Sequence, residues 1–324
     1  MARFRARFAL LGSAVALLAG ALVPAQVAAS QPASAAPSAD YDWVALGDSY
    51  TAGVIPASGD VFEFPRDGCD RTDRAYPQVI ARDLGPLLDL TNVSCGGANI
   101  GDVTYRAQEP IGRHLPPLSE DPDYPFPAVP PQSSVVSEDT DVITVGVGGN
   151  DLHFADILFR CLQLGAESGG EGTPCKDASA REVRYRLVEA SQAYGFMLTV
   201  LHDRAPHAKI LAVGYPAIVP DDTSKCRYGD LEQFGTVTPG DLDWLRDEVL
   251  KPLNTLVEES AAGSDATSFV DLYDSSRAHS VCDDDRWVDG IFTDLPSTPA
   301  FVHPNAAGHR NAADAVGAAM LLNL

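Results

Sequence analysis

Short apolar runs recur along the chain, and most of them end at a glycine or a polar residue. Such runs are typical of buried strands. They predict strands at 43–46 (running on to Ser49), 88–93, 141–146, 209–213 and 268–272. Segments with helical spacing lie at 76–85, 180–203, 239–262 and after His303-Pro304-Asn305 to residue 322. Alternating strands and helices predict an α/β fold, with a parallel sheet of about five strands covered by helices on both faces.

Two segments without such a pattern are predicted to be long loops. Residues 107–134 contain eight of the 24 prolines, which excludes a regular element of any length. Long ordered loops are often functional, so we expect this one to border the substrate cleft; a plain surface excursion is the alternative. Residues 161–175 are glycine-rich and are bracketed by Cys161 and Cys175, which also indicates a loop.

The N-terminal residues have the pattern of a secretory signal peptide rather than of a domain. Three arginines, at positions 3, 5 and 7, precede an uncharged apolar run at 8–22, and small residues at 27–29 and 33–35 offer cleavage sites. A membrane anchor is the alternative, but the run is shorter than the roughly 20 residues that a spanning helix needs. We therefore expect a signal peptide and disordered leader at 1–36, one domain at 37–324, and a secreted protein without a stable membrane anchor.

Charge and cysteine content narrow the functional classes. The net charge is −22, and loss of the three N-terminal arginines would leave about −25, so a nucleic-acid partner is not expected. Six cysteines behind a signal peptide predict three disulfides formed in an oxidising compartment, with a connectivity that the residues alone leave open. Their spacing is not that of a zinc site, and no metal is expected.

Candidate chemistry lies at the ends of predicted strands and in one C-terminal loop. Ser49 follows the first strand, where ligands bind in open α/β sheets, although Gly-Asp-Ser is also a common turn. Gly97 and Asn150 follow the second and third strands, and His303 precedes the last helix. A nucleophile, a base and donors for an oxyanion are the groups that acyl transfer requires. His309 falls inside that helix and is expected to be structural.

Four sequence blocks together resemble those of the SGNH, or GDSL, hydrolases: Gly47-Asp48-Ser49-Tyr50, Gly96-Gly97-Ala98, Gly148-Gly149-Asn150-Asp151 and His303-Pro304-Asn305. The resemblance covers essentially the whole mature chain, and the cysteines are similar to those of secreted actinobacterial lipases and esterases. It implies a flavodoxin-like three-layer sandwich and hydrolysis of carboxylic esters without a cofactor. It also implies Ser49 as nucleophile, His303 as base, and an oxyanion hole from the Ser49 and Gly97 backbone N–H groups and the Asn150 side chain. The implied disulfides are Cys69–Cys95, Cys161–Cys175 and Cys226–Cys282.

The chain departs from the family pattern at one position. Most members place an Asp three residues before the histidine, where this chain has Ala300. We therefore predict a Ser49–His303 dyad oriented by the Ala300 backbone carbonyl, with Asp294 as the nearest upstream acid that could act instead.

Several alternatives remain open at this stage. A carbohydrate O-deacetylase on the same scaffold and a non-catalytic secreted binding module compete with the lipase or esterase prediction. An α/β-hydrolase is disfavoured because no Gly-x-Ser-x-Gly motif surrounds Ser49. The acidic run Asp283-Asp284-Asp285 could bind Ca²⁺, but we interpret it as solvated surface. The expected partner is an ester substrate, lipid or small ester, and the expected state is a monomer.

Overall fold

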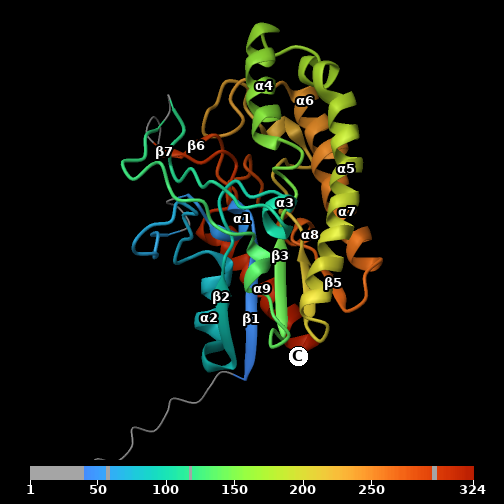
Figure 1. The fold of residues 1–324 in the computed structure, drawn as a ribbon. Helices are drawn as coiled ribbons and strands as arrows, with labels where there is room; N and C mark the ends of the chain where they lie inside the picture. The colour runs from blue at the N-terminus through green and yellow to red at the C-terminus, as the bar shows by residue number, and fades with distance from the viewer. Residues whose placement is uncertain (1–39, 56–58, 117–118, 294–297) are drawn as a thin grey trace, which may run out of the picture. The chain divides into compact units, whose positions relative to one another are not determined.

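Five parallel strands form the central sheet, in the order β2-β1-β3-β4-β5 (Figure 1). This is a computed structural model, and it describes residues 40–55, 59–116, 119–293 and 298–324, which belong to one compact unit, Ser38–Leu324. The strands are β1 Tyr41–Gly47, β2 Leu88–Asn92, β3 Val142–Gly146, β4 Lys209–Val213 and β5 Thr267–Val270. The sequence prediction of a five-stranded parallel α/β fold is confirmed. The predicted signal peptide and leader at 1–36 lie outside the described residues.

Helices cover both faces of this sheet. They are α1 Ser49–Ala52, α2 Tyr76–Leu84, α3 Ile100–Thr104, α4 Phe154–Glu167, α5 Pro174–Arg204, α6 Pro239–Trp244, α7 Lys251–Ala262, α8 Tyr273–Ser276 and α9 Ala306–Asn323. A π-helical turn, Leu245–Leu250, joins α6 to α7, and short 3₁₀ turns lie at Gly85–Leu87, Gln132–Val135 and Thr223–Lys225. A small antiparallel pair, β6 Phe292–Thr293 and β7 Thr298–Pro299, precedes the last helix.

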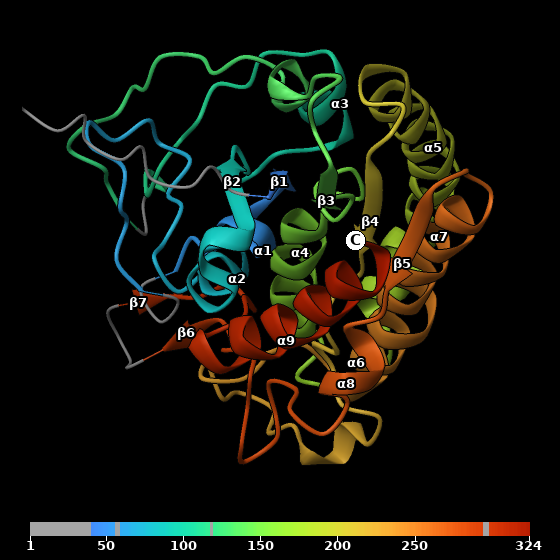
Figure 2. The ribbon, with the colours of Figure 1, turned by 90° about the horizontal axis from the view of Figure 1, so that it is seen from below.

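The side chains of the central strands β1, β3 and β4 alternate between two cores. On one face, Trp43 and Ala45 pack with residues of α2 and α9. These two helices lie side by side (Figure 2). On the other face, Val44 and Leu46 belong to the larger core built with α3, α4, α5 and α7. A strand that is buried on both sides must be apolar throughout, which explains why these strands appear in the sequence as continuous apolar runs.

Two predicted boundaries are wrong in an informative way. The segment 161–175 is not one loop, because α4 continues to Glu167 and places Cys161 inside a helix whose buried residues include Ile157, Leu158 and Gly165. The first strand ends at Gly47 rather than Ser49, because Ser49 already opens α1. The helices α3 and α4 were not predicted, and the helix expected at 180–203 begins earlier, at Pro174.

The strand order places a crevice between β1 and β3. In sheets with the order 2-1-3-4-5, the connections leave these two strands in opposite directions, and ligands bind outside their carboxyl ends. Ser49 follows β1 and Asn150 follows β3, so both lie at this edge of the sheet. Within the described residues, no helix is both long and apolar enough to cross a bilayer.

Candidate active site

Ser49 is presented by a tight turn between β1 and α1. Gly47 has φ +151°, and a Cβ there would lie 2.5 Å from the Gly146 carbonyl oxygen, so only glycine fits. Asp48 caps α1, because its Oδ1 accepts the backbone N–H of Tyr50 at 2.9 Å. This turn makes Ser49 the first residue of the helix, at the carboxyl edge of the sheet.

The imidazole of His303 contacts Ser49 directly. Its Nε2 lies 2.7 Å from the Ser49 Oγ. Its Nδ1 lies 2.9 Å from the Ala300 carbonyl oxygen and 3.0 Å from that of Phe301. Because carbonyl oxygens only accept, Nδ1 carries the proton of the neutral ring, and Nε2 is left to accept the Ser49 hydroxyl.

A strained turn aims those two carbonyls at the ring. Phe301 and Val302 have φ of 47° and 59°, a region that non-glycine residues rarely adopt and that is an outlier for β-branched valine. The turn is held by hydrogen bonds, among them Val302 N–H to the Gly290 carbonyl at 2.9 Å and Tyr50 Oη–H to the Val302 carbonyl at 2.6 Å. Strain of this kind persists only where the surroundings enforce it.

Gly97 and Asn150 lie near each other at the same sheet edge. The Asn150 Nδ2 donates to the carbonyl of Ala98, the residue after Gly97, at 2.8 Å, which leaves its second N–H uncommitted. Gly97 has φ +77°. In the part of the chain that the structure describes, neither its backbone N–H nor that of Ser49 donates to a protein acceptor. The Asp151 carboxylate accepts the Ile100 N–H at 3.0 Å and so ties this loop to the one after β2.

Burial shapes the electrostatics of the site. Desolvation raises the pKa of Asp48 to about 7, against the lowering effect of its hydrogen bond from Tyr215. Desolvation also lowers the pKa of His303 below its ordinary value of 6.5, although the carbonyls of Ala300 and Phe301 act in the other direction. His303 is therefore neutral near pH 7, which is the state in which it can accept a proton.

An apolar cavity of about 70 Å³ opens beside Ser49, Asn150 and His303. Its apolar lining comes from α4, from the residues around the π-helical turn, and from the loops after β4 and β7: Phe154, Ala155, Leu158, Phe159, Ile218, Leu250, Leu253 and Phe301. Phe159 and Phe301 meet edge to face, with ring centroids 5.5 Å apart. π-Helical turns are frequent at functional sites, and this one helps to place Leu250 and Leu253 in the cavity wall.

Comparison with known proteins identifies the family. The sequence model of the GDSL-like lipase/acylhydrolase family matches residues 45–310. The chain belongs to this family. Two relatives agree over nearly the whole chain. Lipase 2 of Streptomyces coelicolor is 35% identical, and the match covers 93% of this chain and 92% of that lipase. An esterase of Streptomyces scabiei is 32% identical, and the match covers 94% of this chain and 90% of the esterase. This GDSL-family chain is thus a carboxylic ester hydrolase of the lipase and esterase type.

Solved structures agree on the fold. The phospholipase A1 of Streptomyces albidoflavus has a TM-score of 0.62 at 20% identity and covers 86% of this chain and 99% of its own. The extracellular lipase of Streptomyces rimosus has the same TM-score at 21% identity, with the same coverage. At these identities the likeness shows that this GDSL-family chain has the fold of those enzymes.

The GDSL-family domain has three disulfides, of which the second joins α4 to α5: Cys69–Cys95, Cys161–Cys175 and Cys226–Cys282. These are the pairs that the family resemblance implied. The first ties the loop after α1 to the Gly96-Gly97 loop, where the Gly96 N–H also donates to the Cys69 carbonyl at 3.1 Å. This disulfide therefore borders the candidate site.

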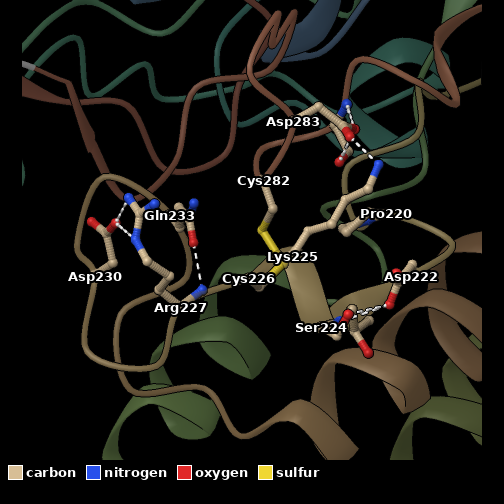
Figure 3. The surroundings of a disulfide bond; sticks show 12 residues. Pro220, Asp222, Ser224, Lys225, Cys226, Arg227, Asp230, Gln233, Cys282 and Asp283 are labelled. Atoms are coloured by element: carbon tan, nitrogen blue, oxygen red, sulfur yellow. Dashed lines mark hydrogen bonds and ion pairs between the residues drawn. A yellow bond between two sulfur atoms is a disulfide. The ribbon is translucent and has the colours of Figure 1, made fainter.

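The remaining candidates from the sequence lie elsewhere. Figure 3 shows Asp283 beside the Cys226–Cys282 disulfide, where it pairs with Lys225 at 2.5 Å. Asp284 and Asp285 are exposed, and no cluster in the described residues could hold a metal ion. His309 is buried inside α9. Asp294 lies outside the described residues.

The proline-rich segment 107–134 supports the site from behind rather than lining the cavity. Gln132 pairs with Gly47 through both amide atoms, at 2.8 and 2.9 Å, and Gln108 donates to the Gly96 carbonyl at 2.7 Å. None of the described residues of this segment, 107–116 and 119–134, lines the cavity beside Ser49. The expectation that the segment borders the substrate cleft is therefore wrong for this cavity.

Sequence reasoning also missed Tyr215, which lines the cavity and contacts the residues preceding Ser49 and Asn150. Its place directly after the fourth strand, at the same sheet edge as the other candidates, was the available signal.

Proposed function

We propose that this chain is a secreted serine ester hydrolase in which Ser49 forms an acyl-enzyme and His303 moves the proton. The observation that carries the proposal is the 2.7 Å separation between the Ser49 Oγ and the His303 Nε2. A positioned base at hydrogen-bond distance is what activates a serine hydroxyl, which is a weak nucleophile by itself.

The tautomer of the His303 ring, with its proton on Nδ1, determines how acylation proceeds. Ser49 Oγ attacks the ester carbonyl carbon while its proton passes to Nε2, and the Nδ1 proton stays between the Ala300 and Phe301 carbonyls. Collapse of the tetrahedral intermediate breaks the bond to the alcohol oxygen, which takes the proton from Nε2. Two neutral carbonyls fix the ring but stabilise the imidazolium less than a carboxylate would.

The oxyanion of that intermediate would be held by three donors: the backbone N–H groups of Ser49 and Gly97, and the Asn150 side chain. The support is that both backbone groups lack another protein acceptor in the described chain, and that Asn150 is oriented by the Ala98 carbonyl. Loss of one such donor typically costs about 10²–10³ in kcat. In deacylation, water attacks the acyl carbon and gives a proton to Nε2. The bond between the acyl carbon and Ser49 Oγ then breaks, the Oγ takes the proton back from Nε2, and the carboxylic acid leaves.

The cavity beside Ser49 supports an acyl chain longer than acetate. Away from Ser49 and His303 its wall is formed by apolar side chains such as Leu158, so each methylene buried there gains about 0.8 kcal/mol. Two more methylenes therefore favour a butyrate over an acetate ester by roughly 15-fold in kcat/KM. This observation favours a lipid or small-ester substrate over an O-acetylated carbohydrate.

Secretion and a monomeric state complete the proposal. The N-terminal sequence pattern and the three disulfides support export to an oxidising compartment. N-terminal sequencing of protein recovered from the culture medium should begin after residue 29 or after residue 35, and recovery only with cells would contradict export. Light scattering of the purified protein should give the mass of one chain; a dimer mass would contradict the monomer.

The decisive experiment compares ester panels across matched variants. Wild type, Ser49→Ala and the exposed-serine control Ser134→Ala would be assayed on p-nitrophenyl acetate, butyrate and octanoate, a phospholipid and acetylated xylan. Wild type and Ser134→Ala should cleave butyrate faster than acetate, and Ser49→Ala should lose at least about 10³ in kcat. Mass spectrometry should find the acyl group on Ser49. Cleavage of acetylated xylan alone would replace the lipase-type proposal with the deacetylase.

A further inference from the structure

The hydroxyl of Tyr215 joins the ends of three neighbouring strands. Tyr215 follows β4, its Oη donates to the Asp48 Oδ2 at 2.5 Å, and the same oxygen accepts the Gly149 backbone N–H at 2.8 Å. Asp48 follows β1 and precedes Ser49, and Gly149 follows β3 and precedes Asn150. One phenol oxygen thus spans the two loops that carry the nucleophile and the side-chain oxyanion donor.

The phenol is held in place by its own surroundings. Tyr215 is 5% exposed, and its backbone N–H and carbonyl both bond the Asn254 side chain of α7, at 2.7 and 3.1 Å. The ring of Tyr50 packs edge to face against it, at 5.2 Å between centroids. Because helix and strand both fix the residue, its hydroxyl is a rigid reference point for the two loops.

Both partners depend on this hydroxyl. The Asp48 carboxylate uses one oxygen to cap α1 and the other to accept from Tyr215, so the phenol also fixes the helix that Ser49 opens. Gly149 leaves room for the contact, because a Cβ there would lie 3.3 Å from the Tyr215 Oη. Without the hydroxyl, a buried carboxylate oxygen and a backbone N–H would each lose their partner.

We propose that Tyr215 is a positioning residue for acyl transfer, which sets the place of the Asn150 amide relative to Ser49 through its hydrogen bonds to Asp48 and Gly149. The proposal rests on the serine hydrolase mechanism above. A transition state bonded to Ser49 Oγ must meet the Asn150 donor at about 3 Å, and a misplacement of 1 Å can cost about 10² in rate. The negative charge on this oxygen develops in the transition state and is absent from the bound substrate, so the loss falls on kcat and leaves KM nearly unchanged.

The test compares Tyr215→Phe with Tyr273→Phe on p-nitrophenyl butyrate. Tyr273 is also a buried tyrosine, and within the described chain its hydroxyl has no hydrogen-bond partner. We expect kcat to fall about 10- to 100-fold in Tyr215→Phe, with KM within about twofold, and no change in Tyr273→Phe. Assays are run well below the unfolding temperature of each variant. A kcat within about twofold of wild type would mean that the hydroxyl serves stability only, and would overturn the proposal.

A double-mutant cycle measures whether the effects of Tyr215 and Asn150 on kcat depend on each other. A hydroxyl that only stabilises the fold would show no such coupling. If Tyr215 acts by placing Asn150, Tyr215→Phe should cost less than about threefold in kcat in an Asn150→Ala background, where no amide remains to be placed. Equal losses in both backgrounds would contradict the proposal.

A second variant covers the case in which Tyr215→Phe does not fold. Gly149→Ala crowds the same hydroxyl from the other loop and should lower kcat by at least about fivefold. A Gly149→Ala enzyme with wild-type kcat would also contradict the proposal. The control for the underlying mechanism is Ser49→Ala: if that variant stays active, the serine hydrolase assignment fails, whereas normal Tyr215→Phe activity beside an inactive Ser49→Ala removes only the role of Tyr215.

Discussion

The Nδ1 atom of His303 lies 2.9 Å from the backbone carbonyl oxygen of Ala300, the residue at which most relatives of this family would place an aspartate. The Phe301 carbonyl lies at 3.0 Å from the same nitrogen. A left-handed turn at Phe301 and Val302 thus replaces a side chain with main chain as the group that orients the ring. Backbone carbonyls do not titrate, so this orientation does not depend on the ionisation of a carboxyl group.

The first prediction concerns Asp294, the nearest upstream acid. Because two carbonyls already accept from the His303 Nδ1, Asp294→Asn should keep kcat within about threefold of wild type. Steady-state kinetics on p-nitrophenyl butyrate would check this, with Ser49→Ala as the reference for an inactive enzyme. A thousandfold fall would show that Asp294 orients the ring and that the dyad is wrong.

The second prediction concerns the acid limb of the pH profile. Burial lowers the pKa of His303 from 6.5, and only the neutral ring can accept the Ser49 proton. The kcat/KM should therefore persist below pH 6.5 and fall as the pH drops through a midpoint under that value. Asp48→Asn removes the buried carboxyl that precedes Ser49 and whose pKa is about 7, and this variant should keep its midpoint under 6.5. A midpoint above 7 in that variant would exclude a desolvated imidazole as the base.

The third prediction concerns stability and follows from Asp48. Its pKa is raised from 3.8 to about 7 by burial, so between these values the folded state binds more protons than the unfolded state. The contribution of Asp48 to the free energy of unfolding is therefore complete below about pH 4 and is lost as the pH rises through 7, with a slope of up to about 1.4 kcal/mol per unit. Asp48→Asn cannot titrate and should lose this slope.

Urea unfolding at pH 5 and pH 8 would measure that difference. The stability of Asp48→Asn relative to wild type should increase from pH 5 to pH 8, whereas the exposed control Asp284→Asn should follow wild type at both values. A relative stability that stays constant between pH 5 and pH 8 would mean that Asp48 is ionised in the folded protein throughout this range.

The fold was predictable because the central strands β1, β3 and β4 are buried on both faces, although the edge strand β2 exposes Asp89 and Thr91. Val142–Gly146 and Lys209–Val213 are apolar runs that stop at glycine, and they appear as β3 and β4 within one residue of the prediction. The sequence did not predict α4, because its second half, from Cys161 to Glu167, falls in the glycine-rich stretch 161–175 that was predicted to be a loop.

The sequence predicted only those site residues that lie at the ends of predicted strands or in the motifs that resemble the family. The contact between Ser49 and His303 joins positions 254 residues apart, so only the resemblance linked them beforehand. The apolar cavity could not be inferred, because Leu158 and Leu253 come from helices whose packing is set by the whole core. Tyr215 follows a predicted strand, but its partners depend on the sheet order β1-β3-β4, which no local pattern encodes.

The last prediction concerns the Cys69–Cys95 disulfide. It closes a segment of 26 residues and holds the loop after α1 against Gly96, next to the candidate oxyanion donor Gly97. Its removal should lower the free energy of unfolding by about 3–4 kcal/mol through the entropy of the unfolded chain, and should also lower kcat because the Gly97 N–H loses its support. The matched control is Cys226–Cys282, which closes 56 residues beside the Lys225–Asp283 ion pair.

Double Cys→Ala variants that remove each disulfide would be compared by urea unfolding and by kcat. Both should lose stability, but only the Cys69/Cys95 pair should lose activity while still folded. Equal kcat in the two folded variants would mean that the first disulfide supports the fold without supporting the site.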